Sequence, residues 1–143
     1  MIIRNKFFYG YWIVLAGMVT LTLSSGFAFF GFSVFNKPIA DDFGWSRGEV
    51  TVAFSIFIIT AAILSPIVGW LTDKRGPRQV LFLGTIALSL ALFLLSMTSA
   101  LWNYYLFHLC LGIGHVLLQT IPLSIIISNW FHRLRGTMQG LAF

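Results

Sequence analysis

The amino-acid sequence predicts an all-α membrane protein with four membrane-spanning helices and the beginning of a fifth. Hydrophobic residues make up 58% of the 143 residues and charged residues only 9%, whereas charged residues make up about a quarter of a typical soluble domain. The few charges lie between long apolar runs, and bilayer hydrocarbon forces such runs to satisfy their backbone groups as helices. The net charge of +5 does not indicate nucleic-acid binding, because the basic residues punctuate apolar runs and form no continuous stripe.

Each apolar run is long enough to cross about 30 Å of hydrocarbon at a rise of about 1.5 Å per residue. The first run is longer than the apolar core of a secretory signal peptide, so we expect it to be retained. The chain stops just after a fifth run begins, and we therefore expect it to be the N-terminal part of a longer protein. The expected spans are residues 11–35, 50–71, 79–97 and 101–130, with the fifth beginning at about residue 137.

The connections carry residues that begin helices. Ser46 and Glu49 have the spacing of a capping box before the second span, in which each side chain bonds the backbone of the other residue. Pro77 fits the first position of the third helix, where a missing N–H costs nothing. Either hydroxyl of Thr98 and Ser99 could cap the fourth helix.

Two prolines and one small-residue pattern lie inside the spans. Pro66 and Pro122 are expected to be tolerated, because neighbouring helices can satisfy the freed carbonyl groups. The third span is apolar nearly all round and is expected to face lipid. One side of the second span is expected to be a seam for close helix packing; its residues are Thr51, Ser55, Ala62, Ser65 and Gly69.

The basic residues predict the orientation. Seven of the nine fall on one side if the spans alternate, and only Lys37 and Arg47 fall on the other side, together with Asp41, Asp42 and Glu49. The positive-inside rule therefore predicts a multi-pass protein of the cell membrane with a cytoplasmic N-terminus. The seven are Arg4, Lys6, Lys74, Arg75, Arg78, Arg133 and Arg135.

The connection after the second span has the pattern Gly-x-Leu-x-Asp-Lys-x-Gly-x-Arg, from Gly69 to Arg78. This pattern resembles the loop between the second and third spans of major facilitator superfamily transporters. The segments at 8–12, 43–49 and 129–136 are similar to the monocarboxylate transporter and oxalate:formate antiporter branch of that family. The resemblance implies a protein of about twelve spans in two six-helix halves, with the chain covering part of the first half and the remaining C-terminal part as its partner.

The resemblance also implies a function. A member of this family would be a secondary active transporter and no enzyme, and this branch would carry a small organic anion such as a mono- or dicarboxylate by alternating access. Animal monocarboxylate transporters place a lysine within the first span, where this chain has Phe30, which argues against the lactate-type proton mechanism. No cofactor is expected. The alternative is a complete four-span scaffold or regulatory protein.

The fourth span carries the candidate binding residues. His108, Gly112, His115 and Gln119 are spaced four, three and four apart and therefore share one helix face. His115 and Gln119 fall near mid-depth, where polar groups are costly against lipid and usually face a cavity or a partner. We expect them to bind substrate; the alternative is that they form interhelical hydrogen bonds that hold the bundle together.

The first span adds two weaker candidates. Ser25 and Phe29 lie on a face of small polar and aromatic character that also includes Thr22 and Ser33, and both could contact substrate. Hydroxyls in a helix can bond carbonyls of the preceding turn, so structural packing is the alternative interpretation of this face.

His108 is a candidate for proton coupling. It precedes Gly112 by four residues, the place of the arginine in the Arg-x-x-x-Gly pattern of proton-coupled drug antiporters in the family. The preferred interpretation is a packing histidine that bonds a neighbouring carbonyl, because most buried polar groups are satisfied in this way. A haem held by His108 and His115 is a further alternative, but it lacks a facing ligand, and no spacing indicates a metal site.

The resemblance assigns the charged connection to a gate on the cytoplasmic side. In the family the equivalent of Asp73 meets the N-terminus of a helix from the second half, where unsatisfied amides and partial positive charge favour an anion. The alternative is a charged turn that only follows the positive-inside rule. The residues expected at the gate are Gly69, Asp73, Lys74, Gly76, Arg78, Arg133 and Arg135.

Overall fold

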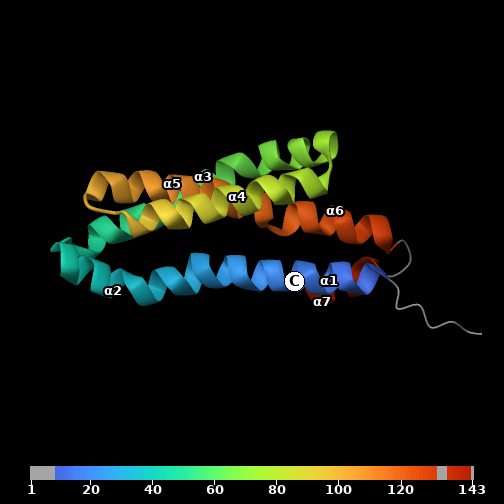
Figure 1. Ribbon diagram of the computed structural model, residues 1–143, viewed down its shortest axis with the longest axis horizontal. Coiled ribbons are helices and arrows are strands. Elements are labelled where there is room, and N and C mark those ends of the chain that lie inside the picture. The colour runs from blue at the N-terminus through green and yellow to red at the C-terminus, as the bar shows by residue number, and fades with distance from the viewer. Residues whose placement is uncertain (1–8, 132–134, 143) are drawn as a thin grey trace, which may run out of the picture.

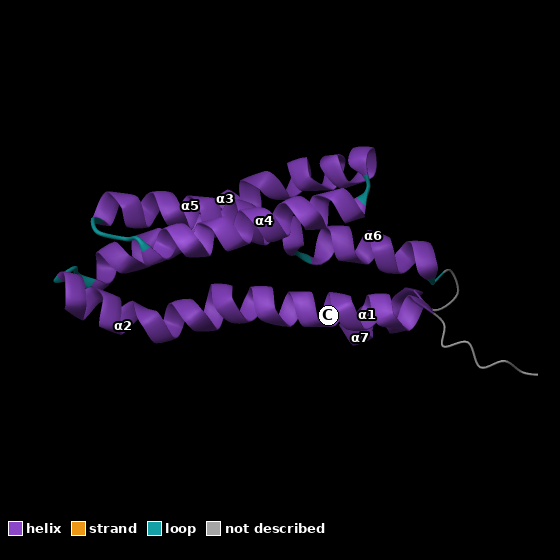
Figure 2. Ribbon diagram, in the orientation of Figure 1, coloured by secondary structure: helices purple, strands orange, loops and turns teal. Residues whose placement is uncertain are grey.

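The computed structural model describes residues 9–131 and 135–142, and in these ranges every regular element is a helix (Figures 1 and 2). Short turns join long helices, as expected for an all-α membrane protein. The elements are α1 (Tyr9–Ser25), the π-helix η1 (Gly26–Gly31), α2 (Phe32–Phe43), α3 (Arg47–Arg75), α4 (Pro77–Ser96), α5 (Leu101–Leu118), α6 (Thr120–Trp130) and α7 (Arg135–Ala142).

Four helical stretches are long and apolar enough to cross a membrane, which confirms the predicted fold class. They are Trp12–Phe43, Arg47–Arg75, Pro77–Ser96 and Leu101–Trp130. The first is longer than expected, because α1, η1 and α2 continue without a break through residues 36–43, which we expected to be a loop. The fifth helix, α7, begins at Arg135, close to the expected residue 137.

The helices α3, α4 and α5 pack as one tight unit. A Cβ atom added to Gly114 would lie 2.6 Å from the Leu88 amide nitrogen of α4, and one added to Gly112 would lie 2.8 Å from the Phe57 carbonyl oxygen of α3. Glycine is therefore required on α5 for both backbones to approach this closely. The described helices do not pack along the expected seam on α3, where Thr51, Ser55 and Ala62 are exposed, and the closest backbone contacts of these glycines lie on α5.

The third span packs on one face only. Val80, Gly84 and Ala91 are buried against the neighbouring helices. Phe82 and Phe93 on the other face are 68% and 62% exposed, as expected for side chains that face lipid. One side of α4 is therefore exposed among the described helices, and its contact with lipid stays a prediction.

The first span lies alongside this unit and contacts α5 and α6 through α1 and α3 through α2 (Figure 1). Near its beginning, Val14 packs with Ile127 and Phe131 of the fourth span and the residue that follows it. Near its end, Ala40 packs with Val50 and Tyr104. Between these clusters, α1 also approaches α6 at Gly17, where a Cβ atom would lie 3.3 Å from the Leu123 side chain.

Two of the expected helix starts are confirmed and one is wrong. Ser46 and Glu49 form the capping box, with the Glu49 amide donating to the Ser46 hydroxyl at 3.3 Å and the Ser46 amide donating to the Glu49 carboxylate at 2.8 Å. Pro77 begins α4. The N-cap of α5 is Ala100 without a side-chain bond, because the Thr98 hydroxyl donates back to the Leu95 carbonyl instead.

The fourth span is broken at one residue, although we expected a continuous helix from the sequence. Gln119 is extended, with φ −73° and ψ −173°, and separates α5 from α6. Proline cannot donate to the carbonyl four residues earlier, and its ring crowds that carbonyl. Pro122 therefore accounts for a break that begins just before it, while Pro66 lies within a continuous α3.

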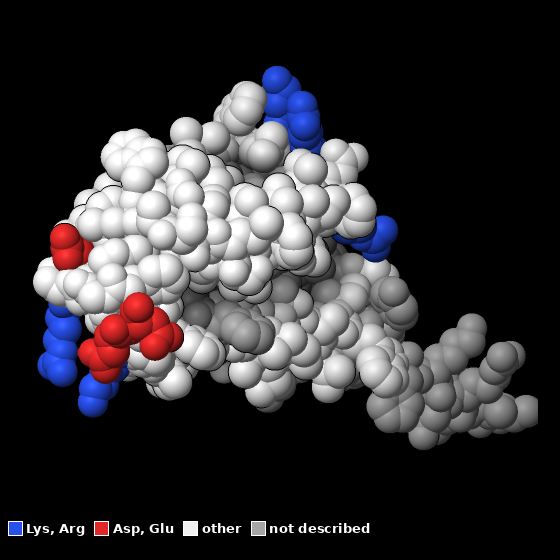
Figure 3. Space-filling model, turned by 60° about the vertical axis from the view of Figure 1, so that its left-hand side comes forward, with Lys and Arg blue, Asp and Glu red and all other residues white. Residues whose placement is uncertain are grey.

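The charges separate to the two ends of the bundle. Lys37, Asp41, Asp42, Arg47 and Glu49 lie around the connection between α2 and α3, and the acidic side chains visible in Figure 3 gather on that side. The opposite end, called the basic end here, has Asp73, Lys74, Arg75 and Arg78 around the turn between α3 and α4.

Candidate functional site

A buried polar cluster joins the first span to the fourth. His115 is 1% exposed and Ser24 is 3% exposed. The Ser24 hydroxyl oxygen lies 2.9 Å from His115 Nδ1, and the Gln119 amide nitrogen lies 2.9 Å from His115 Nε2. The structure therefore brings His115 and Gln119 together, as the sequence analysis expected.

The chemistry of these bonds assigns the imidazole proton. The Gln119 amide nitrogen only donates, so Nε2 accepts, and the neutral ring carries its proton on Nδ1 and donates to Ser24. Turning the Gln119 amide would offer its oxygen to Nε2 instead, and an imidazolium would then donate to both neighbours. The cluster can thus hold His115 in either protonation state with the ring in the same place.

Two aromatic rings contact the imidazole. The centroid of Phe29 lies 6.0 Å from that of His115 at an interplanar angle of 77°, which is an edge contact. Phe57 of α3 lies closer, at 5.1 Å and 48°. His115 is therefore surrounded by one hydroxyl, one amide and aromatic surface, with no charged side chain among these contacts.

Backbone irregularities lie on both sides of His115. The π-helix η1 follows Ser24 and contains Phe29, while the break at Gln119 is one turn beyond His115. π-helical segments are rare and occur often at functional sites, and interrupted helices often form the binding sites of transporters. Neither feature was predicted from the sequence; the available signals were Gly26 and Gly31, which bound η1, and Pro122, which follows the break at Gln119.

Of the two candidates on the first span, one contacts the cluster. Phe29 does, but Ser25 forms no hydrogen bond with it, and the neighbouring Ser24 does so instead. The face expected for Ser25, Phe29 and Ser33 assumed a regular α-helix that repeats every 3.6 residues. The π-helix η1 begins at Gly26 and interrupts this repeat between Ser25 and Phe29.

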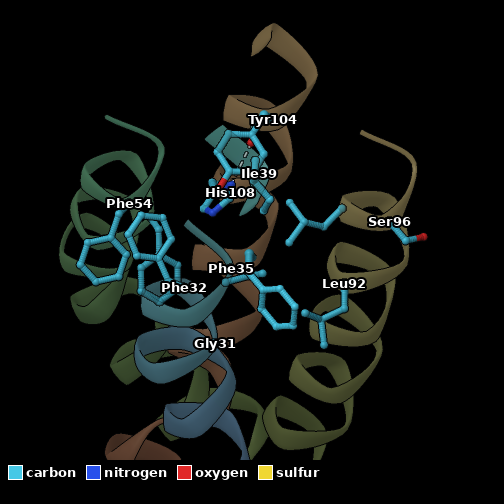
Figure 4. Close-up of a pocket in the computed structure, with 12 residues that line it drawn as sticks. Gly31, Phe32, Phe35, Ile39, Phe54, Leu92, Ser96, Tyr104 and His108 are labelled. Atoms are coloured by element: carbon cyan, nitrogen blue, oxygen red, sulfur yellow. Dashed lines mark hydrogen bonds between the residues drawn. The ribbon is translucent and has the colours of Figure 1, made fainter. Parts of the chain in front are cut away.

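His108 lines one side of a separate apolar cavity of about 390 Å³. Its Nδ1 donates to the Tyr104 carbonyl at 2.9 Å, and its ring packs against Tyr104 with centroids 4.3 Å apart. Figure 4 shows His108 and Tyr104 with Phe32, Phe35 and the other lining side chains. This geometry agrees with the packing interpretation of His108, since a carbonyl occupies one ring nitrogen.

The gate candidates lie at the basic end. Asp73 is exposed in the last turn of α3, and the Lys74 ammonium lies 4.8 Å above the Trp70 ring. Gly76 ends α3 with φ +84°, which favours glycine, and Gly69 and Arg78 lie on the flanking helices. Arg133 lies outside the described residues, and Arg135 begins α7 although its side chain is not described.

The described residues contain no group of three or more side chains that could hold a metal ion. His108 and His115 each contact their own neighbours rather than one another. These contacts give the haem alternative no support.

The helices define a protein class first: a multi-pass α-helical membrane protein with a polar cluster between its first and fourth spans. Residues 11–143 match the Major Facilitator Superfamily, and the chain belongs to this family. The fold class and the resemblance predicted from the charged connection are therefore confirmed.

Three relatives illustrate the similarity. The chain is 29% identical over 128 residues to the uncharacterized MFS-type transporter YcxA of Bacillus subtilis, covering 87% of this chain and 31% of the relative. It is 35% identical over 109 residues to the fujikurins efflux protein of Gibberella fujikuroi, covering 73% and 22%. It is 24% identical over 139 residues to the oxalate:formate antiporter of Oxalobacter formigenes, covering 97% and 32%.

The chain thus spans a third or less of the length of these relatives. The family and the names of the relatives indicate a membrane transporter rather than an enzyme. The finer likeness to monocarboxylate transporters has only loose support, because the relatives differ widely in what their names say they carry.

Proposed function

We propose that the protein to which this chain belongs is a secondary active transporter of a small organic anion, such as a mono- or dicarboxylate, and works by alternating access. The observation that carries this proposal is the Ser24–His115–Gln119 cluster between two interrupted spans. We further propose that the protein lies in the cell membrane with a cytoplasmic N-terminus, because most of its basic residues fall on that side.

The chemistry of the cluster suits a carboxylate. Turning toward a ligand, the Gln119 amide could donate one hydrogen bond, and a protonated His115 would add a positive charge that strengthens such bonds. The first turn of α6 follows Gln119 and has no side-chain cap, and an uncapped helix N-terminus favours an anion. Two of the relatives are named for carboxylates, the oxalate:formate antiporter and a probable L-galactonate transporter of Escherichia coli.

The test is transport of a panel of monocarboxylates and dicarboxylates into vesicles that contain the full-length protein. We expect His115→Ala and Gln119→Ala each to lower transport roughly tenfold to a hundredfold, since a hydrogen bond to a charged group is worth about 1.5–3 kcal/mol. Transport by the wild type should also rise as the pH falls, because the imidazolium form attracts the anion.

Thr85→Ala on the exposed side of α4 is the control, since its hydroxyl only bonds the Leu81 carbonyl of its own helix. It should transport normally and show the same membrane insertion. If no carboxylate is carried, or if both cluster variants transport as the wild type does, the proposed substrate site is wrong.

We also propose that Asp73 belongs to the cytoplasmic gate, where the remaining part of the protein would present a helix N-terminus. Such a contact would exist in only one of the two transport states and would bias their populations by roughly 1–2 kcal/mol. The proposed gate residues Gly69, Lys74, Gly76 and Arg78 surround it, with Arg133 and Arg135 following the fourth span.

Asp73→Asn in the full-length protein should then slow transport and shift the population toward the inward-open state, with substrate binding kept. Cysteine labelling of the cytoplasmic cavity would measure this shift. Unchanged labelling together with normal transport would show that Asp73 is only part of a charged turn.

A further inference from the structure

We infer that the basic end contains a binding site for an anionic phospholipid, with its phosphate group between α4 and α6 and one acyl chain between α1, α4 and α6. The polar part of the site is a pocket of about 400 Å³, called the basic pocket here. Arg75, Arg78, Gln79, Asn129 and Trp130 line it. This site is separate from the His115 cluster and does not depend on the identity of the transported substrate.

Within residues 9–131 and 135–142, the two arginines of the basic pocket have no carboxylate partner. All four acidic residues lie in the described ranges, and none forms an ion pair with Arg75 or Arg78. Two guanidinium groups present planar sets of N–H donors that match phosphate oxygens in pairs. The amides of Gln79 and Asn129 add further donors, so the pocket offers a phosphate both charge and directed hydrogen bonds.

An apolar pocket of about 270 Å³ adjoins the basic pocket, and Arg78 and Ile126 line both. It extends away from the basic end, because Leu81 follows Arg78 by one turn into α4 and Leu123 precedes Ile126 by one turn in α6. Gly17 of α1 also lines it. The two pockets together therefore change from polar to apolar along the direction of the helices.

This change favours a lipid over a free phosphate. The basic pocket lies at the ends of membrane-crossing helices, which is the level of lipid head groups, and the apolar pocket continues toward the hydrocarbon region. Trp70, in the last turns of α3, is 59% exposed at the same end, as is typical of the membrane interface. Basic pockets between spanning helices bind anionic lipid head groups in other membrane proteins.

The experiment measures lipid binding to the full-length protein by native mass spectrometry, using phosphatidylglycerol and phosphatidylcholine with identical acyl chains. We expect the wild type to bind phosphatidylglycerol at least about fivefold more tightly, and Arg75→Gln and Arg78→Gln each to remove about fivefold in affinity. Asn129→Leu, which changes no charge, should also weaken binding. Circular dichroism checks that each variant is folded.

Lys74→Gln is the matched control, because it removes the same charge one residue away and Lys74 does not line the basic pocket. It should change the affinity by less than about twofold. Equal binding of the two lipids by the wild type overturns the inference, as does an equal loss in Lys74→Gln and the arginine variants. Competition by glycerol phosphate as effective as that by the lipid would overturn the lipid assignment and identify a soluble phosphate site.

Discussion

The three-helix unit of α3, α4 and α5 and the first span are held in place by different kinds of contact. In the unit, backbones almost touch at Gly84, Gly112 and Gly114. In the first span, a Cβ atom at Gly17 would meet only a side chain, at 3.3 Å, and many residues are exposed, such as Phe30, at 74%. Packed backbones have few alternative arrangements, so the unit is expected to behave as a rigid body.

The candidate site lies on the border between these two regions. Ser24 and Phe29 belong to the first span, whereas His115 and Phe57 belong to the rigid unit. A displacement of the first span would therefore break or remake the hydrogen bond at His115 Nδ1. The hydrogen bond between Ser24 and His115 should therefore respond to movement of the first span. Three predictions test the contrast between the first span and the three-helix unit.

The largest effect is expected from Gly114→Ala, which attacks the rigid unit. The new Cβ atom would lie 2.6 Å from the Leu88 nitrogen and 2.7 Å from its Cα atom. Backbone atoms cannot move aside as a side chain can, so we expect a loss of about 2–3 kcal/mol in the free energy of unfolding. Chemical unfolding in detergent micelles would measure it.

Gly69→Ala is the control for this variant, because a Cβ atom there meets nothing within 4 Å. It should be neutral or slightly stabilising, since alanine favours a helix over glycine by about 1 kcal/mol. Equal stability of the two variants would show that α4 and α5 are not packed backbone to backbone.

A smaller and more local effect is expected from Ser24→Ala at the border. This change leaves the buried His115 Nδ1 without its partner, which typically costs about 1–3 kcal/mol. Nitrogen-15 NMR of the histidine ring would detect the lost bond directly, and thermal unfolding would measure the cost.

Ser25→Ala provides the comparison, because Ser25 has no bond to the cluster although the sequence pattern favoured it. We expect its NMR spectrum and stability to match those of the wild type. If Ser25→Ala perturbs the His115 resonances more than Ser24→Ala does, the first span is rotated relative to the structure described here.

The spans were predictable from the sequence because the bilayer leaves the backbone few choices. Charged and turn residues also located the helix starts at Ser46 and Pro77. The local pattern could not reveal which face of each helix meets a partner, since small residues suit a seam on α3 as well as on α5. The close packing at Gly112 and Gly114 depends on the shape of the neighbouring helices, which the local sequence pattern does not give.

The candidate site was only partly predictable for a related reason. His115 and Gln119 stand out because polar residues at mid-depth are rare. Ser24 could not be distinguished from Ser25, because the π-helix that follows both residues interrupts the regular α-helical repeat. A break at Gln119 was similarly hidden, since one proline, Pro122, interrupts its helix and the other, Pro66, does not.

The smallest effect is expected at the connection between the two regions, where Ser46 caps α3. Ser46→Ala removes the acceptor of the Glu49 amide, and loss of such a cap typically costs about 1 kcal/mol. Ser99→Ala is the matched control, because Ser99 precedes α5 but the cap of that helix is Ala100 without a side-chain bond. Thermal unfolding should show a lower melting temperature for Ser46→Ala and an unchanged one for Ser99→Ala.

Because α2 and α3 meet at this turn, the loss of stability in Ser46→Ala should be accompanied by faster amide exchange in residues 47–50, while α4 and α5 stay protected. Uniformly faster exchange in all four spans would instead mean that the first span and the three-helix unit unfold together, and the contrast between them would then fail.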